Sequence, residues 1–266
     1  MSVNIDDHVR VSDISNYLNC PRKVYYTYQG HDPKKTITPS YVAALILKEM
    51  AQDYAEVITS EEMFPSLQSL LDMSARQVTT IYRDELAGID PETISLATSE
   101  VCSHLDGIMN GIQASIQAFG IEKLLDFLTS MDSEPVLYSE KLVMSGSPDR
   151  LVMVDGCLTP SIIRTGKAPI SGAWKNDRIR LTALSILLED KYDSAVMKGM
   201  VEYARYGIVR EVPIRHADRR KVLALAGRVR KIRDGRLPER PDDASCDYCG
   251  HVEHCQVTQT LASRFF

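Results

Sequence analysis

The sequence predicts an α/β fold in which a helical N-terminal half precedes a mixed-sheet core and a cysteine-rich end. Helical periodicity dominates between residues 40 and 131. Short strand-like segments begin at residue 134, and three closely spaced cysteines follow residue 245. With 266 residues, 44% of them hydrophobic and 25% charged, the chain is long enough to bury a sizeable core.

Helices are expected in sequence order through the N-terminal half. Ser12 or Asp13 can cap a first helix, and Pro21 suits the first position of a second. The later helical stretches are residues 40–58 and residues 66–131, the latter broken between Gly88 and Pro91.

The second half of the sequence predicts strands joined by short turns, together with two helices. The expected strands are residues 134–144, 150–154 and 157–164, and a hairpin of residues 196–205 and 207–214 around Tyr206 and Gly207. A strong helix is expected over residues 173–190. In residues 218–235, Val222, Leu225, Val229 and Ile232 form the apolar stripe of an amphipathic helix that Gly235 can end.

The charge is distributed unevenly. The formal net charge is −5, yet residues 205–240 contain twelve Lys or Arg and only four Asp or Glu. This excess predicts a basic face on an acidic protein, or a solvated helix surface. No apolar run approaches the roughly 18 residues that span a bilayer, and the N-terminus shows no secretory signal, so we expect a cytoplasmic protein.

Four of the six cysteines suggest a metal centre. A C-x2-C-x5-C segment and one distant thiol can ligate one ion or cluster, and these residues are Cys246, Cys249, Cys255 and Cys20. Spacing alone leaves zinc and iron–sulfur open, with His251 or His254 able to replace one thiolate around zinc. Either centre would tie the two ends of the chain together and stabilise the fold. Cys102 and Cys157 lie in apolar patterns and are expected in the core.

The ordered motifs resemble a known family. VSDISNYLNCPRKVYY, GSPDRL and RTGKAP, followed by a helix, a hairpin and the cysteine triplet, are similar to the CRISPR-associated RecB-like exonucleases, the Cas-four family. The helicase-associated AddB nuclease domain shares the cysteine layout. The resemblance implies a restriction-endonuclease-like PD-(D/E)xK core with a mixed sheet, and a [4Fe–4S] cluster on Cys20, Cys246, Cys249 and Cys255.

The resemblance also implies partners and boundaries. Family members cut single-stranded or unwound DNA ends with Mg²⁺ or Mn²⁺, and they trim spacer precursors together with CRISPR integrase proteins. The implied segments are cluster-contributing helices in 1–30, a helical region in 31–132, a nuclease core in 133–240 and a C-terminal cysteine subdomain in 241–266.

The metal-binding motifs depart from the family pattern. Asp149 matches the family Asp, but Ile162 stands at the second carboxylate and Arg164 at the lysine. The family glutamine, tyrosine and upstream histidine are replaced by Arg180, Leu184 and Lys48. The pocket becomes about two charge units more positive, because a Glu is lost and an Arg is gained. We therefore expect no bound Mg²⁺ or Mn²⁺ and little metal-dependent cleavage.

Three uses of the altered pocket stay open. Arg164, Lys167 and Arg180 can contact a DNA phosphate. Alternatively, the two arginines pair with nearby acids as a remnant ion cluster, the candidates being Asp149, Asp177 and Glu140. In the third, Asp155 or Asp177 completes a displaced metal site. Aromatic residues available for base stacking are Trp174, Tyr203 and Tyr206.

Three functions follow from these alternatives. The first is a DNA-binding, catalytically inactive nuclease-fold protein with an iron–sulfur cluster, acting in CRISPR adaptation or DNA repair. The second is an active single-stranded DNA exonuclease with a rearranged metal site. The third is a zinc-stabilised protein-interaction module.

Overall fold

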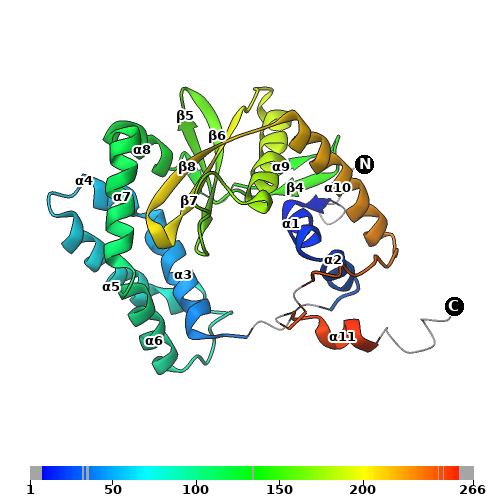
Figure 1. The fold of residues 1–266 in the computed structure, drawn as a ribbon, viewed down its shortest axis with the longest axis horizontal. Coiled ribbons are helices and arrows are strands. Elements are labelled where there is room, and N and C mark those ends of the chain that lie inside the picture. The colour runs from blue at the N-terminus through cyan, green and yellow to red at the C-terminus, as the bar shows by residue number, and fades with distance from the viewer. Residues whose placement is uncertain are drawn as a thin grey trace.

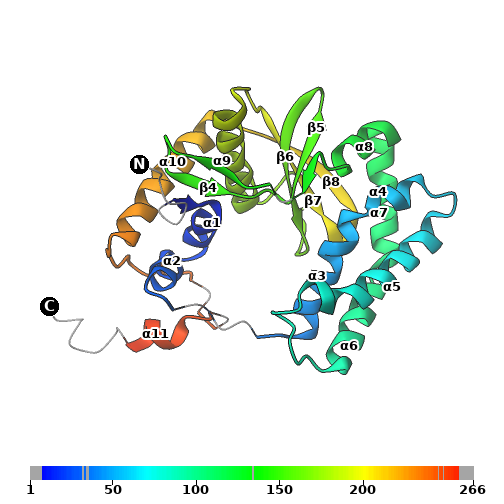
Figure 2. The same cartoon turned by 180° about the vertical axis from the view of Figure 1, so that it is seen from behind.

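The computed structural model describes residues 8–31, 33, 36–133, 135–244, 246–247 and 249–257. Within these residues, helices cover both faces of a central five-stranded sheet (Figures 1 and 2). This arrangement confirms the predicted mixed α/β fold. Some residues of the predicted segments lie outside the described residues, namely residues 1–7, Glu134 and residues 258–266.

The N-terminal half is helical. Two short helices follow the first strand, β1 (Val9–Arg10), and they are α1 (Val11–Asn19) and α2 (Pro21–Tyr28). The helical region that follows contains α3 (Pro39–Gln52), α4 (Tyr54–Thr59), α5 (Met63–Ile81), α6 (Pro91–Cys102), α7 (Leu105–Phe119) and α8 (Ile121–Leu128).

Two mixed sheets form the second half together with β1. The smaller sheet has the order β1-β4-β3, with β3 (Leu137–Ser139) and β4 (Met144–Gly146). The larger sheet has the order β2-β5-β6-β7-β8, with β2 (Asp132–Ser133), β5 (Arg150–Val154), β6 (Cys157–Arg164), β7 (Lys198–Tyr203) and β8 (Ile208–Pro213). A short 3-10 turn, η2 (Ala204–Tyr206), joins β7 to β8. The remaining helices are α9 (Lys175–Tyr192), α10 (His216–Arg233) and α11 (Val252–Val257).

The larger sheet separates two apolar cores. Helices α3 to α8 pack on one face, and α1, α9 and α10 pack on the other. Side chains alternate between faces along a strand, so Ile163 of β6 enters the first core and Ile162 enters the second. The strand therefore aims residues 162 and 164 toward α9, where the candidate site lies.

Most predicted elements are confirmed, and several bounds differ from the prediction. The helical stretch expected over 66–131, for example, also breaks at Ser103, His104 and Gly120. Helix α1 begins at Val11, because Arg10 occupies the cap position and its backbone N–H donates to the Asp13 carboxylate at 3.1 Å. The helix expected over 40–58 breaks at Asp53. The strand expected over 134–144 is interrupted by a turn, in which the Ser139 hydroxyl accepts the Leu142 N–H at 3.0 Å.

The placement of two cysteines was also wrong. Cys102 and Cys157 are exposed rather than buried. Cys102 is the last residue of α6, and Cys157 begins β6 directly after the hairpin turn, so both lie where their elements leave the core. Apolar neighbours in sequence do not bury a side chain at the end of an element.

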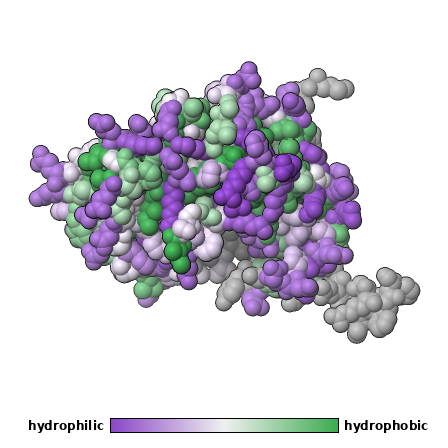
Figure 3. Space-filling view, turned by 45° about the horizontal axis from the view of Figure 1, so that its top comes forward, coloured by the Kyte–Doolittle hydropathy of each residue, from purple (hydrophilic) through white to green (hydrophobic). Residues whose placement is uncertain are grey.

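The described helices include none that is long and apolar enough to cross a membrane. Figure 3 shows hydrophilic side chains over much of the face that it presents, with smaller apolar patches between them.

Candidate functional site

Asp149 lies at the start of β5 with its carboxylate enclosed by donors. The residue as a whole is only 7% exposed to solvent. One carboxylate oxygen accepts the Ile163 N–H at 3.0 Å and lies 3.5 Å from the Arg180 guanidinium; the other lies 3.3 Å from the Lys48 ammonium. Donors from three different elements therefore occupy the oxygens that a cation would need.

The position of a second carboxylate is closed by apolar packing. Ile162 and Leu184, at the positions where the resemblance predicted a Glu and a Tyr, are fully buried in the core between the larger sheet and α9. An ionised group buried among these apolar side chains would lose its hydration, which is energetically costly.

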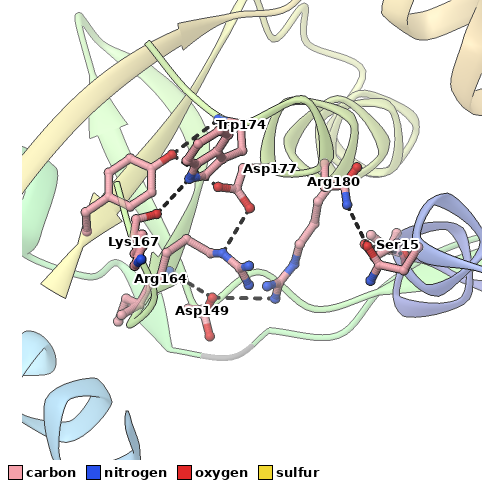
Figure 4. Close-up of polar contacts among 12 residues, drawn as sticks. Ser15, Asp149, Arg164, Lys167, Trp174, Asp177 and Arg180 are labelled. Atoms are coloured by element: carbon pink, nitrogen blue, oxygen red, sulfur yellow. Dashed lines mark hydrogen bonds and ion pairs between the residues drawn. The ribbon is translucent and has the colours of Figure 1, made fainter. Parts of the chain in front are cut away.

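Arg164 and Asp177 form a second pair beside Asp149 (Figure 4). The Arg164 guanidinium lies 2.9 Å from the Asp177 carboxylate, whose other oxygen accepts the Tyr203 hydroxyl at 3.1 Å. Burial raises the pKa of Asp177, and the neighbouring Arg164 and Tyr203 offset part of that rise. Burial also raises the pKa of Tyr203 to about 12, so this phenol stays a hydrogen-bond donor at neutral pH.

A cleft of about 610 Å³ opens between α1 and α9, beside these pairs. Its cationic side chains are Arg10, Arg164 and Arg180, and Asp177 also lines it. Uncharged hydrogen-bonding side chains complete the lining, namely Ser12, Ser15, Asn16, Asn19, Ser145, Ser147 and Asn176. Guanidinium groups surrounded by hydroxyls and amides suit a phosphate-bearing ligand.

A buried ion pair between Arg150 and Glu202 lies in the larger sheet next to Asp149. Arg150 follows Asp149 directly and is almost fully buried. Its guanidinium donates to Glu202 at 2.7 Å and to Gln52 at 3.0 Å, and also to the Ala51 carbonyl. Burial raises the pKa of Glu202, and Arg150 opposes that rise. The contacts of Arg150 with Ala51 and Gln52 connect the sheet to α3, the helix that carries Lys48.

The remaining predicted site residues are dispersed. Lys167 lies in the loop after β6, where its carbonyl accepts the Trp174 indole N–H at 2.6 Å. Asp155 lies at the opposite end of β5 from Asp149 and pairs with Lys123 at 3.3 Å and Lys198 at 2.8 Å. A five-residue strand spans roughly 17 Å, so Asp155 cannot complete a metal site with Asp149.

Solvent exposure tests the predicted roles of the aromatic residues and of Glu140. Tyr203 is fully buried and cannot stack on a base, so that expectation was wrong. Tyr206 is half-buried, whereas Trp174 is 49% exposed. Glu140 is exposed in the turn between β3 and β4, and the acids that pair with the two arginines are Asp149 and Asp177.

The four predicted cluster cysteines line one cavity of about 210 Å³. Cys20 lies between α1 and α2 and is nearly buried, while Cys246, Cys249 and Cys255 come from the C-terminal segment beside α2. In the described part of the chain, no three His, Cys, Asp or Glu side chains are already arranged around a single metal position. The cysteines thus share a cavity without converging on one point.

Cationic side chains, which the sequence reasoning missed, also line the cysteine cavity. The Arg22 guanidinium lies 3.4 Å from the Cys255 sulfur, and Lys23 and Arg240 face the same space. The CPRK motif contains the signal, because Arg22 and Lys23 follow Cys20 on the first turn of α2. Positive charge of this kind stabilises thiolates and so favours ligation.

Comparisons with known proteins find distant relatives. No protein-family model matches the chain. An uncharacterized protein of Archaeoglobus fulgidus is 31% identical over 137 residues, which is 51% of this chain and 61% of the relative. The CRISPR-associated exonuclease Cas4/endonuclease Cas1 fusion of Leptospira interrogans is 27% identical over 128 residues, which is 46% of this chain and 24% of the fusion.

The matched region therefore spans less than two thirds of either relative's length. About half of this chain has a distant Cas4-like relation in sequence. Among solved structures, a crystal structure of SSO0001 aligns with 93% of this chain and 98% of that chain, with 14% identity and a TM-score of 0.36.

Proposed function

We propose that this chain is a DNA-binding protein with a nuclease-like PD-(D/E)xK core that does not cleave DNA by the metal-dependent route. The observation that carries the proposal is the enclosed carboxylate of Asp149, which already faces Lys48, Arg180 and a backbone N–H. The distant Cas4-like relation supports DNA as the ligand.

Electrostatics argues against a divalent cation beside Asp149. Two cationic side chains lie within 3.5 Å of the carboxylate, and the neighbouring strand position contributes only the apolar side chain of Ile162. A cation there would have to displace Lys48 and Arg180 and then bind one carboxylate. Each like-charge contact at about 4 Å costs roughly 1–4 kcal/mol near a protein surface.

Two basic surfaces support binding to DNA. The first is the α1–α9 cleft, where Arg10, Arg164 and Arg180 each pair with an acid but stay 53%, 44% and 26% exposed. The second lies on and after α10, where exposed basic side chains are Arg220, Arg228, Lys231, Arg236 and Arg240. Other cations of the same stretch bind within the protein, since Arg205 pairs with Glu100 and Arg219 with Glu189. The basic face is therefore smaller than its sequence suggests.

We further propose that Cys20, Cys246, Cys249 and Cys255 hold a [4Fe–4S] cluster. The four cysteines line one cavity, as the ligands of one centre would, and the order of the surrounding motifs favours an iron–sulfur cluster over zinc. Arg22, Lys23 and Arg240 offset the negative charge of the thiolates. The bound cluster would join α1 and α2 to the C-terminal segment and contribute to folding.

A structural or regulatory subunit in CRISPR adaptation or DNA repair is the biological role that fits these properties. Such a protein would bind single-stranded DNA or DNA ends and work beside an integrase or another nuclease. The support is the relation to a fusion that contains Cas4 and Cas1.

The decisive experiment incubates purified protein with labelled single-stranded DNA and Mn²⁺. We expect salt-sensitive binding without degradation. Degradation that disappears in Asp149→Ala would overturn the inactivity and favour the rearranged exonuclease. Absence of binding at moderate salt would overturn the DNA-binding role.

The metal is identified separately. Protein purified without oxygen should be brown and contain iron that is lost in Cys249→Ala. Colourless protein that contains one zinc per chain would overturn the cluster and favour the zinc-stabilised interaction module.

A further inference from the structure

The loop of residues 165–174 between β6 and α9, called here the β6–α9 loop, is fastened along its length. The Arg210 guanidinium donates to the Pro169 carbonyl at 2.9 Å and to the Gly172 carbonyl at 2.7 Å. The Trp174 indole N–H donates to the Lys167 carbonyl at 2.6 Å. These contacts hold the backbone of a segment that has no regular secondary structure of its own.

This held backbone displays apolar side chains to solvent. Ile170 is 103% exposed, as much as an isolated residue, and Trp174 is 49% exposed. A single exposed apolar side chain is ordinary on a protein surface. Here, however, Arg210 binds the carbonyls on both sides of Ile170, so the side chain is presented on a preorganised loop. Preorganisation lowers the ordering cost of inserting it into a partner.

Cationic side chains lie near the loop, and two of them, Arg164 and Arg180, also pair with the acids Asp177 and Asp149. Arg164 precedes it and opens into the α1–α9 cleft, and Lys167 lies within it (Figure 4). Arg180 lines the same cleft. An apolar tip flanked by cations matches DNA, in which apolar base faces alternate with phosphates. Side chains such as Ile can insert between adjacent bases, and Trp can stack on an unpaired base.

We propose that the β6–α9 loop is a base wedge, in which Ile170 inserts at the junction of duplex and single-stranded DNA and Trp174 stacks on the freed base. The proposal rests on the proposed DNA binding and adds the junction as the preferred form of DNA. Phosphates of the single strand would follow the cleft, toward Arg164 and Arg180.

The test uses a duplex with a single-stranded tail and 2-aminopurine at the last paired position, whose fluorescence increases on unstacking. Binding of the intact protein should increase the fluorescence. Ile170→Ala should abolish the increase and weaken binding to this DNA about fivefold or more, the effect expected for loss of a base contact. Ile121→Ala is the matched control, because Ile121 is 50% exposed on α8, away from the loop.

A second variant tests the fastening of the loop. Arg210→Lys keeps the charge but loses the planar guanidinium, in which Nη1 donates to the carbonyls of Pro169 and Gly172 and Nη2 donates to that of Ile170. It should also reduce the fluorescence increase, while binding to single-stranded DNA without a junction stays within about twofold.

The outcomes distinguish the two proposals. If wild-type protein binds the tailed duplex but Ile170→Ala gives the same affinity and fluorescence, the wedge is wrong and the DNA-binding role remains. If wild-type protein binds neither DNA, both proposals are overturned.

Discussion

Replacing Asp149 by Asn should strengthen DNA binding, the reverse of its effect in a metal-dependent nuclease. In the structure, Asp149 neutralises Lys48 at 3.3 Å and Arg180 at 3.5 Å. An Asn side chain keeps an oxygen that can accept the Ile163 N–H, but it removes the negative charge. Both cations then lose this acidic partner and can bind a phosphate more tightly.

The expected magnitude follows from Coulomb's law. A phosphate bound to these two cations would lie about 6 Å from the Asp149 carboxylate, and the repulsion there is roughly 0.7–3 kcal/mol for effective dielectric constants between 80 and 20. The Lys48 and Arg180 side chains are 29% and 26% exposed, so water screens the repulsion toward the lower value. About 1 kcal/mol corresponds to about fivefold tighter binding.

The assay is fluorescence anisotropy of a labelled single-stranded oligonucleotide, repeated over a series of salt concentrations. Asp155→Asn is the matched control, because Asp155 also pairs with two cations but lies at the far end of β5. Both variants change the net charge equally. Only Asp149→Asn should tighten binding by about fivefold, with a steeper salt dependence from the added phosphate contact.

Two results would refute this reasoning. Weaker binding by Asp149→Asn alone would mean that the carboxylate helps DNA, as it would through a bound cation. Equal tightening by both variants would mean that net charge, rather than the pocket, controls the affinity.

Three further predictions concern stability. Cys249→Ala should lower the melting temperature and remove iron absorbance, whereas Cys157→Ala, at an exposed thiol, should change neither. Arg150→Met should lower the free energy of unfolding in urea by about 3–5 kcal/mol because it leaves Glu202 buried without its partner, and the double variant Arg150→Met/Glu202→Leu should recover most of the loss. Burial raises the pKa of Glu202, so the ionised carboxylate destabilises the fold above that pKa, and this penalty disappears as the pH falls through it. The free energy of unfolding of wild type relative to Glu202→Gln should therefore rise on acidification. A difference in urea midpoints that does not change with pH would contradict this assignment.

Local chemistry explains what could be predicted from the sequence. Strands β5 and β6 match their predicted bounds, because apolar and β-branched runs are separated there by a tight turn at Asp155 and Gly156. Pro21 begins α2 as predicted, since proline suits the first turn of a helix. The motif also predicted that Cys20 shares one centre with the C-terminal cysteines, and the four side chains line one cavity.

Long-range packing decided the rest. The sequence could show that Asp149 lacks a second carboxylate, but not that Lys48 would reach it from α3. Nor could it show that Arg210, on β8, would hold the loop around Ile170. Residues close in sequence determined the elements through turn chemistry, hydrophobic period and capping. The choice of ion-pair partners depends on how those elements pack. Charged residues far apart in the chain come within hydrogen-bond distance only when the helices pack against the two faces of the sheet.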